Sequence, residues 1–343
     1  MCGRGNKVLK EVGVGSPPLF PLLSEAKKLM AARSIPTVNY LGDVTFLMER
    51  ILQRNRQESE TYEAKLFIVG SSANGFGWDR SDVDLCLVIP PQELPSKTGT
   101  KTVLRKLRNL LPQKCSLTRC ELIPAIVPIL KFRDQWSGIE CDLNVNNVVG
   151  TYNTHLLAMY ARVDPRVPAL GTFVKHWAQR MGIHGGSKRR LSTYALLLMV
   201  IQYLQCGCSP PVVPNLQARF PKTFEHNRAV EKVDMDLELP WNELRSANRS
   251  RLGKLSVGFI AYYANFEFAQ WAISILNGRP LAANVAIQHL LFIEQAFKIL
   301  VEEPYNKGNV AHTVCDEAVF GKIRRAFTRT DEVLRAQKSL KFL

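Results

Sequence analysis

Residues 70–89 read GSSANGFGWDRSDVDLCLVI. The segment leaves an apolar run at 64–70, makes a turn rich in Gly and Ser, and enters a second apolar run that opens with Asp82 and Asp84. Because residues i and i+2 of a strand share a face, we expect these two carboxylates to project side by side. Adjacent carboxylates repel, so the pair indicates a bound cation, and Mg²⁺ prefers oxygen ligands completed by substrate phosphates. The alternative is a pair of solvated acids on a surface strand edge.

The turn itself excludes a P-loop. That motif needs Lys and then Ser or Thr after its second glycine, whereas Phe76 and Gly77 follow Gly75 here. What remains is a turn whose backbone N–H groups and Ser71 hydroxyl can bind a triphosphate, with glycine where a Cβ would block close approach.

A third carboxylate is expected on a neighbouring strand. Residues 138–149 (GIECDLNVNNVV) alternate so that Glu140 and Asp142 share one face while apolar residues take the other. We expect Asp142 rather than Glu140 to complete the set. Three carboxylates around two Mg²⁺ ions can bind a departing pyrophosphate and activate a hydroxyl nucleophile, which is the two-metal form of phosphoryl transfer.

Apolar spacing divides the chain near residue 150 into two kinds of structure. Before it, the pattern predicts helices within 21–56 and at 103–111, and strands at 64–70, 84–90, 126–132 and 138–149. After it, the spacing is helical at 155–162, 170–181, 191–205, 253–264, 282–300 and 322–334. The sequence therefore predicts an α+β fold in which a small sheet lobe precedes a larger, helical lobe.

Charge points to a polyanionic partner. The 343 residues carry 45 Lys and Arg against 30 Asp and Glu, a net charge of +15, which favours nucleic acid ahead of an anionic membrane. Residues 97–114 hold six basic residues and no acidic one, and this stretch is either an RNA-facing ridge or a solvated helix face. The longest clean apolar run, 195–201, is too short to span a membrane. The N-terminal residues hold no apolar stretch like that of a signal peptide, so we expect an intracellular chain. The eight cysteines include no C-x-x-C pair, so we expect reduced thiols and no structural zinc.

Eight blocks in order resemble the cytoplasmic poly(A) polymerases of the germline-development type, within the nucleotidyltransferase superfamily that includes DNA polymerase β. The blocks are VGSSANGFGWDRSDVDLCLV at 69–88, VPILKFRD at 127–134, DLNVNN at 142–147, NTHLL at 153–157, VKHWA at 174–178, LSTYALLLMVIQYLQ at 191–205, LSVGFIAYYANFEF at 255–268 and VEEPYNKGN at 301–309. The resemblance implies a bilobed α+β nucleotidyltransferase with a small mixed sheet. Its catalytic domain would be 37–150, and 1–36 with 151–343 would form a helical central domain carrying a base-recognition segment at 301–309.

The resemblance also implies roles for individual residues. Asp82, Asp84 and Asp142 would be the catalytic, metal-binding carboxylates for Mg²⁺, with Mn²⁺ able to substitute. An RNA 3′-hydroxyl would attack the α-phosphate of ATP and expel pyrophosphate. The other nucleotide contacts implied are Gly70, Ser71, Lys175 and Thr193 at the phosphates, Asn147 and Thr154 near the ribose, and Tyr194 stacked on the base. Tyr194 is alternatively a core residue of its helix.

Two departures from uridine-adding relatives bear on the base. Some of those relatives carry a second Lys where Gln179 stands, and in them a His follows the E-[DE]-P block, whereas 302–309 contains none. A larger purine would then fit, and Glu303 could accept a hydrogen bond from the adenine amine. The resemblance thus implies ATP rather than UTP. The alternatives are a uridylyltransferase on the same fold, an inactive scaffold and a nucleotide-binding regulatory protein.

The sequence carries no recognisable RNA-reading module beside the catalytic blocks. The basic segments 187–190 and 322–341 can bind a phosphate backbone but cannot read bases. The resemblance implies that an RNA-binding partner protein, docked on the helical lobe, directs the enzyme to mRNA 3′ ends in the cytoplasm. No membrane partner is expected.

Overall fold

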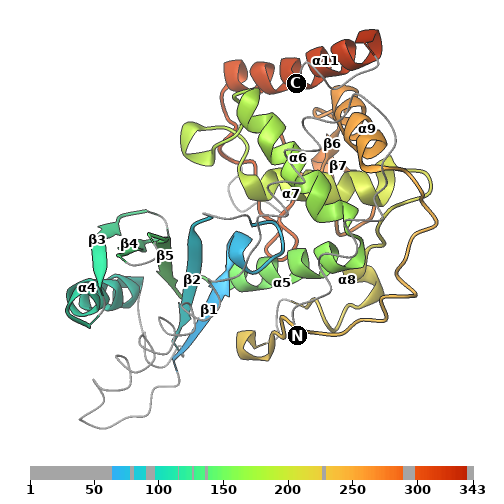
Figure 1. The fold of residues 1–343 in the computed structure, drawn as a ribbon. Coiled ribbons are helices and arrows are strands. Elements are labelled where there is room, and N and C mark those ends of the chain that lie inside the picture. The colour runs from blue at the N-terminus through green and yellow to red at the C-terminus, as the bar shows by residue number, and fades with distance from the viewer. Residues whose placement is uncertain are drawn as a thin grey trace. The chain divides into compact units, whose positions relative to one another are not determined.

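A computed structural model describes residues 64–77, 81–89, 97–114, 116–125, 127–135, 138–225, 229–288 and 298–337. The described residues form two compact units, 64–159 with 229–236 and 160–225 with 237–337. Figure 1 labels most of the helices and strands of both units. The helices expected within 21–56 lie outside the described residues.

The first unit is built on a five-stranded mixed sheet. Its strands are β1 (Lys65–Val69), β2 (Val83–Val88), β3 (Leu117–Ile123), β4 (Ile129–Asp134) and β5 (Glu140–Val145). The spatial order is β1-β2-β5-β4-β3, with β2 and β5 parallel and the other neighbours antiparallel. Together with the helices below, this sheet confirms the α+β class.

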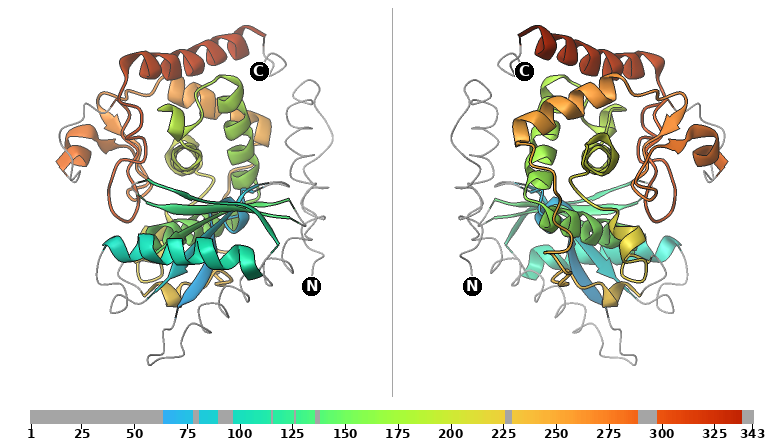
Figure 2. Two further views of the ribbon diagram at one scale, coloured as in Figure 1. Left: turned by 90° about the vertical axis from the view of Figure 1, so that its left-hand side faces the viewer. Right: turned by 90° about the vertical axis from the view of Figure 1, so that its right-hand side faces the viewer.

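The core of this unit lies between the sheet and α4 (Lys97–Lys114), which runs along one sheet face (Figure 2). Leu104, Leu107 and Leu111 follow the helical period and are buried against Leu85 and Leu143 of the strands. Strand alternation then directs the polar residues of β2, β4 and β5 to the opposite face. The basic side chains at 101, 105, 106 and 108 are exposed on the side of the helix away from this core.

Two strand predictions in this unit need correction. The segment Leu117–Ile123 forms β3, which the sequence reading missed because charged Arg119 and Glu121 interrupt the pattern. Arg119 lies in a β-bulge with φ of +56°. The strand expected over 138–149 ends at Val145, and residues 148–149 begin a helix although β-branched residues favour strands.

Helices dominate the second unit. They are α6 (Arg166–Arg180), α7 (Thr193–Gln202), α8 (Leu216–Arg219), α9 (Leu252–Ala264), α10 (Ala283–Gln288) and α11 (Glu317–Gln337), while α5 (Val148–Val163) contributes residues to both units. Aromatic rings fill the core: Trp177 packs 4.7 Å from Phe327, centroid to centroid, and Phe259 packs 5.0 Å from Tyr263. None of the described helices is long and apolar enough to cross a membrane.

This unit is not purely helical, contrary to the sequence reading. A two-stranded sheet pairs β6 (Trp271–Ala272) with β7 (Leu281–Ala282). Of the helix expected over 282–300, residues 283–288 form α10 and residues 298–300 are not helical, while 289–297 lie outside the described residues. The helix expected over 191–205 changes to a π-helical turn at Tyr203–Gly207. A Cβ at Gly207 or Gly258 would overlap the Tyr203 side chain, so these glycines make room for its ring.

Candidate active site

Asp84, Asp142 and Lys131 stand at one level across the sheet, and we refer to them as the charged row. The strand register places Asp84 of β2 opposite Asp142 of β5, and Asp142 opposite Lys131 of β4. Asp82 precedes β2 by one residue. The structure therefore brings Asp84 and Asp142 together from distant parts of the chain. It also places there Lys131, which the sequence reading missed. Its position between Leu130 and Phe132 in an apolar strand indicated a polar partner, but not which acids it would meet.

The Lys131 ammonium lies among carboxylates. It is 3.0 Å from Glu140, 3.3 Å from Asp142 and 3.9 Å from Asp82. Burial, followed by the charges of Asp142 and Asp82, raises the pKa of Asp84 to about 6, and Lys131 acts in the opposite direction. Burial alone would lower the pKa of Lys131, but the hydrogen bond from Lys131 to Glu140 and the charge of Asp142 raise it above its ordinary value.

These carboxylates fit a divalent cation by their chemistry. Oδ1 of Asp142 is buried and accepts no hydrogen bond, although the Lys131 ammonium is an ion-pair neighbour. Asp84 stands between like charges, and a hard cation with oxygen ligands would relieve that repulsion. Among the described residues, no three His, Cys, Asp or Glu side chains are gathered closely enough to hold a metal ion. Lys131 instead lies within ion-pair distance of both Asp82 and Asp142.

Gly70 opens a 3-10 turn, Gly70–Ser72, directly after β1 and has φ of +70°. A Cβ at this position would lie 2.9 Å from Cγ of Asp84 and closer still to its Oδ2. Only glycine therefore fits both the left-handed backbone and the approach to the carboxylate. The Gly70 N–H donates to Oγ1 of Thr154 (2.9 Å), whose hydroxyl donates to the Gly150 carbonyl (2.6 Å). Ser71 is partly exposed in this turn.

The amide of Asn146 extends the pairing of β2 and β5 beyond their ends. Its Oδ1 accepts the Ile89 N–H (2.7 Å) and its Nδ2 donates to the Ile89 carbonyl (2.9 Å). Asn146 has φ of +57°, a conformation that asparagine tolerates. Asn147 follows directly and accepts the Gly150 N–H on its carbonyl (3.1 Å) at the start of α5. Sequence reasoning singled out Asn147 and missed Asn146, whose side chain joins the ends of β2 and β5.

In the second unit, Thr193 and Tyr194 form the first turn of α7. Ser192 caps this helix by accepting the Ala195 N–H on its hydroxyl (3.1 Å). Oγ1 of Thr193 lies 2.9 Å from Nε2 of His184. Burial, and then the charge of Lys175 on α6, lowers the pKa of His184. Lys175, Thr193 and His184 therefore occupy one neighbourhood of this unit.

Tyr194 is linked to Glu303, 109 residues further along the chain. Its hydroxyl donates to Oε1 of Glu303 (3.2 Å). The other oxygen, Oε2, accepts the N–H groups of Tyr305 (2.8 Å) and Asn306 (2.6 Å). Glu303 is buried and therefore shapes the loop 302–309 as well as facing the ring that the sequence reading assigned to the base. That structural part of its role was not foreseen.

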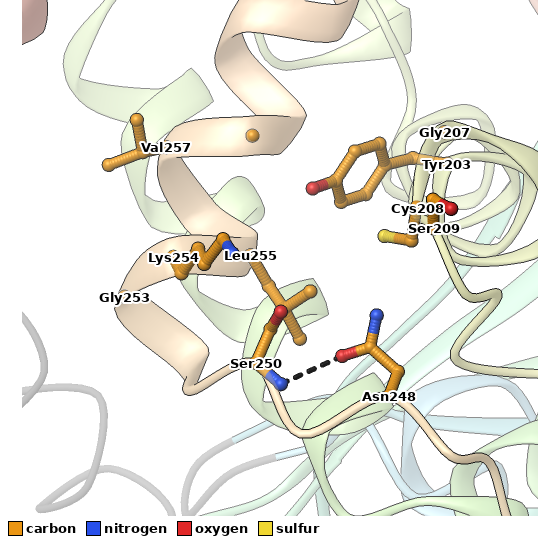
Figure 3. A pocket seen from close by; sticks show the side chains of 11 residues that line it. Tyr203, Gly207, Cys208, Ser209, Asn248, Ser250, Gly253, Lys254, Leu255 and Val257 are labelled. Carbon is orange, nitrogen blue, oxygen red and sulfur yellow. Dashed lines mark hydrogen bonds between the residues drawn. The ribbon is translucent and has the colours of Figure 1, made fainter.

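A pocket of about 560 Å³ lies in the second unit beside the start of α9 and the π-helical turn, and Tyr203 and Lys254 are among the residues that line it (Figure 3). The loop at 248–250 forms one wall and is held by Arg166, whose guanidinium donates to the backbone carbonyls of Asn248 (3.0 Å) and Ser250 (2.9 Å). None of the residues predicted for the site lines this pocket.

Two family models match the chain. Residues 42–162 match the central palm domain of mitochondrial-like poly(A) RNA polymerases, and residues 251–309 match the Cid1 family of poly A polymerases. Poly(A) RNA polymerase GLD2 of Danio rerio is 39% identical over 282 residues, covering 82% of this chain and 56% of the relative. Poly(A) RNA polymerase gld-2 of Caenorhabditis elegans is 32% identical over 379 residues, covering 92% of this chain and 33% of the relative.

Solved structures of RNA nucleotidyltransferases also match this chain. The structure of a GLD-2/RNP-8 complex matches with a TM-score of 0.79 and 30% identity, covering 94% of this chain and 97% of that chain. A crystal structure of Cid1 poly(U) polymerase shares the fold, with a TM-score of 0.71 and 24% identity over 93% of this chain and 95% of that one. The chain spans little more than half the length of the vertebrate GLD2 relatives it matches.

Proposed function

This chain belongs to the GLD-2 family of poly(A) RNA polymerases, and from that premise we propose that it is a template-independent RNA adenylyltransferase. It would add AMP from ATP to mRNA 3′ ends in the cytoplasm. The observation that carries the proposal is the strand register that sets Asp84 opposite Asp142, with the backbone of Gly70 against the Asp84 carboxylate. Two-metal nucleotidyl transfer needs carboxylates beside a turn that can bind phosphates, and these two observations support the proposal in that way.

Asp82, Asp84 and Asp142 would hold the divalent cations, with Mg²⁺ as the physiological ion and Mn²⁺ as a substitute. When bound, such ions lower the pKa of a hydroxyl nucleophile and neutralise triphosphate charge. The RNA 3′-oxygen forms a bond to the α-phosphorus of ATP, the bond from that phosphorus to pyrophosphate breaks, and the hydroxyl proton is released. The protein's own part is to hold Asp84 and Asp142 side by side, which the parallel pairing of β2 and β5 supports, while Asp82 precedes β2 by one residue.

The remaining nucleotide contacts are proposals of the same kind. Gly70 and Ser71 would meet the triphosphate through the turn after β1, and Thr154 would hold that turn by its hydrogen bond to Gly70 while standing near the ribose with Asn147. In the second unit, Lys175 and Thr193 would contact the β- and γ-phosphates. A lysine suits this task as a compact point charge.

Tyr194 would stack on the base, since an aromatic face is a sequence-tolerant platform. Its hydrogen bond to Glu303 orients the ring. Oε1 of Glu303 has a second lone pair, with which it would accept a hydrogen bond from the exocyclic amine of adenine. The loop at 302–309 contains no histidine, which favours the larger purine over uracil.

An RNA-binding partner would supply target choice. Solved structures similar to this one are of a GLD-2/RNP-8 complex and a GLD-2 and GLD-3 complex. We propose that the RNA-binding partner of this chain binds to the surface of the helical unit.

Primer extension tests the proposal. Oligo(A) RNA labelled at its 5′ end is incubated with Mg²⁺ and each NTP separately, using the wild-type chain and Asp82→Ala. Asp236→Ala is the matched control, because it removes an exposed aspartate from the same unit outside the site. A ladder with ATP that disappears only in Asp82→Ala supports adenylyl transfer. A ladder chiefly with UTP points to uridylyl transfer. If none of the four nucleotides gives a ladder, the proposal that the chain is an enzyme is overturned in favour of a scaffold or regulatory protein.

A further inference from the structure

Lys131 is the one member of the charged row that the catalytic assignment above does not use. Its ammonium lies 3.3 Å from Asp142 and 3.9 Å from Asp82, two of the three carboxylates assigned to the cations. It projects from β4, the strand next to β5, and its side chain is 37% exposed. Lys131 therefore provides a positive charge at the same carboxylate oxygens that a divalent ion would use.

Glu140, which is not one of the three carboxylates assigned to the cations, makes the shortest ion pair of Lys131, at 3.0 Å from its ammonium. Glu140 lies two residues before Asp142 on β5, so both side chains project from one face of that strand. The lysine thus has two kinds of partner: the catalytic carboxylates on one hand, and Glu140, which is outside the catalytic set, on the other. A long, flexible lysine side chain can release the first while keeping the second.

We propose that Lys131 is a positioning residue that acts as an internal counter-ion, standing in for the divalent cation at Asp82 and Asp142 and withdrawing to Glu140 when the ion binds. The inference rests on the proposed function, because it takes these carboxylates as the metal ligands. In this role the Lys131 ammonium offsets the mutual repulsion of Asp82, which is exposed, and of Asp84 and Asp142, which are partly buried. The same role makes metal occupancy dependent on the position of one lysine.

Lys131→Met should lower the melting temperature of the metal-free chain and raise its affinity for the cation. Without metal, its melting temperature falls below that of the wild type, because the acids have lost their counter-ion. Its affinity for the cation rises, because no ammonium has to be displaced. Substitution of a residue that contacts metal ligands changes metal affinity by about 10- to 100-fold. We therefore expect the dissociation constant of the cation to decrease about tenfold in Lys131→Met. Lys131→Arg, which keeps the charge, behaves more like the wild type.

Glu140→Gln provides a test with the reverse sign. If Glu140 receives the displaced lysine, its loss leaves Lys131 bound only to the catalytic carboxylates and weakens cation binding. The same substitution in the Lys131→Met background then has little effect. A Glu140 that acted on the ion directly, through its charge, would weaken binding equally in both backgrounds, and that result would overturn the withdrawal step.

The experiment measures Mn²⁺ binding to the full chain in the absence of nucleotide and RNA. Binding is monitored as the decrease in the electron paramagnetic resonance signal of free Mn²⁺. Melting curves are recorded in EDTA and in Mn²⁺. Lys65→Met is the matched control, because Lys65 is an exposed lysine on β1 of the same sheet. Lys131→Gln serves as a second neutral variant if Lys131→Met does not fold.

The outcomes separate this inference from the proposed function. Tighter Mn²⁺ binding and a lower metal-free melting temperature, both absent in Lys65→Met, support the counter-ion role. Unchanged or weaker binding by both neutral Lys131 variants overturns it, even where the wild type extends RNA and the proposed function stands. A wild-type chain that binds no Mn²⁺ overturns both together.

Discussion

Replacing Gly70 by alanine tests the link between the turn after β1 and the catalytic carboxylates. Two effects add. The native φ of +70° lies in the left-handed region, which costs an alanine about 1–2 kcal/mol. The new Cβ would also lie 2.9 Å from Cγ of Asp84, where ordinary contacts are 3.4–4 Å. Either the turn or Asp84 must move by roughly 1 Å, and a displacement of that size reduces turnover by about 100-fold.

Gly138→Ala separates the two effects. Gly138 has the same φ of +70°, but its added Cβ would meet only the end of the flexible Arg133 side chain, at 3.3 Å. Both variants should melt lower, by about 2–4 °C for each kcal/mol in domains of this size. Only Gly70→Ala should lose about 100-fold in kcat/KM for ATP in primer extension. A Gly70→Ala enzyme as active as Gly138→Ala would refute the reasoning that the glycine is needed to seat Asp84.

Two further predictions concern stability and reactivity. Arg166→Lys removes the guanidinium that joins Asp164 to the loop carbonyls at 248 and 250. Urea unfolding should show that the free energy of unfolding falls by about 2–4 kcal/mol. Arg219→Lys is the control because Arg219 belongs to an exposed ion pair, and an equal loss in both variants would contradict the argument. Burial raises the pKa of Cys86 to about 11, so at about pH 8 it is almost wholly protonated and unreactive. Iodoacetamide labelling and peptide mass mapping should therefore find exposed Cys315 modified before Cys86, and rapid labelling of Cys86 in the folded chain would count against that burial.

The parts of the fold that could be predicted are those in which a local pattern and the tertiary structure agree. Asp82 and Asp84 alternate with buried Val83 and Leu85, so period-2 chemistry locates β2 and the face its acids use. The family resemblance read from the ordered blocks is confirmed by the comparisons. The choice of Asp142 over Glu140 remains a prediction, although the register sets Asp142 opposite Asp84.

Other features depended on contacts that no local pattern encodes. β3 has charges at 119 and 121 and is a strand because β4 pairs with it around a bulge. Strands as short as Trp271–Ala272 carry too few residues for any period to be read. Lys131 belongs to the site only through the pairing of β4 with β5, and a basic residue in an apolar strand does not by itself reveal which acids it will meet.

The parallel pairing of β2 with β5 also has a consequence for folding. The β3–β4 and β4–β5 neighbours close through short connections, whereas β2 reaches β5 only after the whole segment from residue 89 to residue 139 has been looped out. Loop closure of that length is entropically unfavourable, and contacts distant in sequence slow folding. We therefore expect Asp84 and Asp142 to meet late, so that partly folded chains lack the assembled acids. Substitutions that weaken β4 would then delay the appearance of activity during refolding without touching either carboxylate.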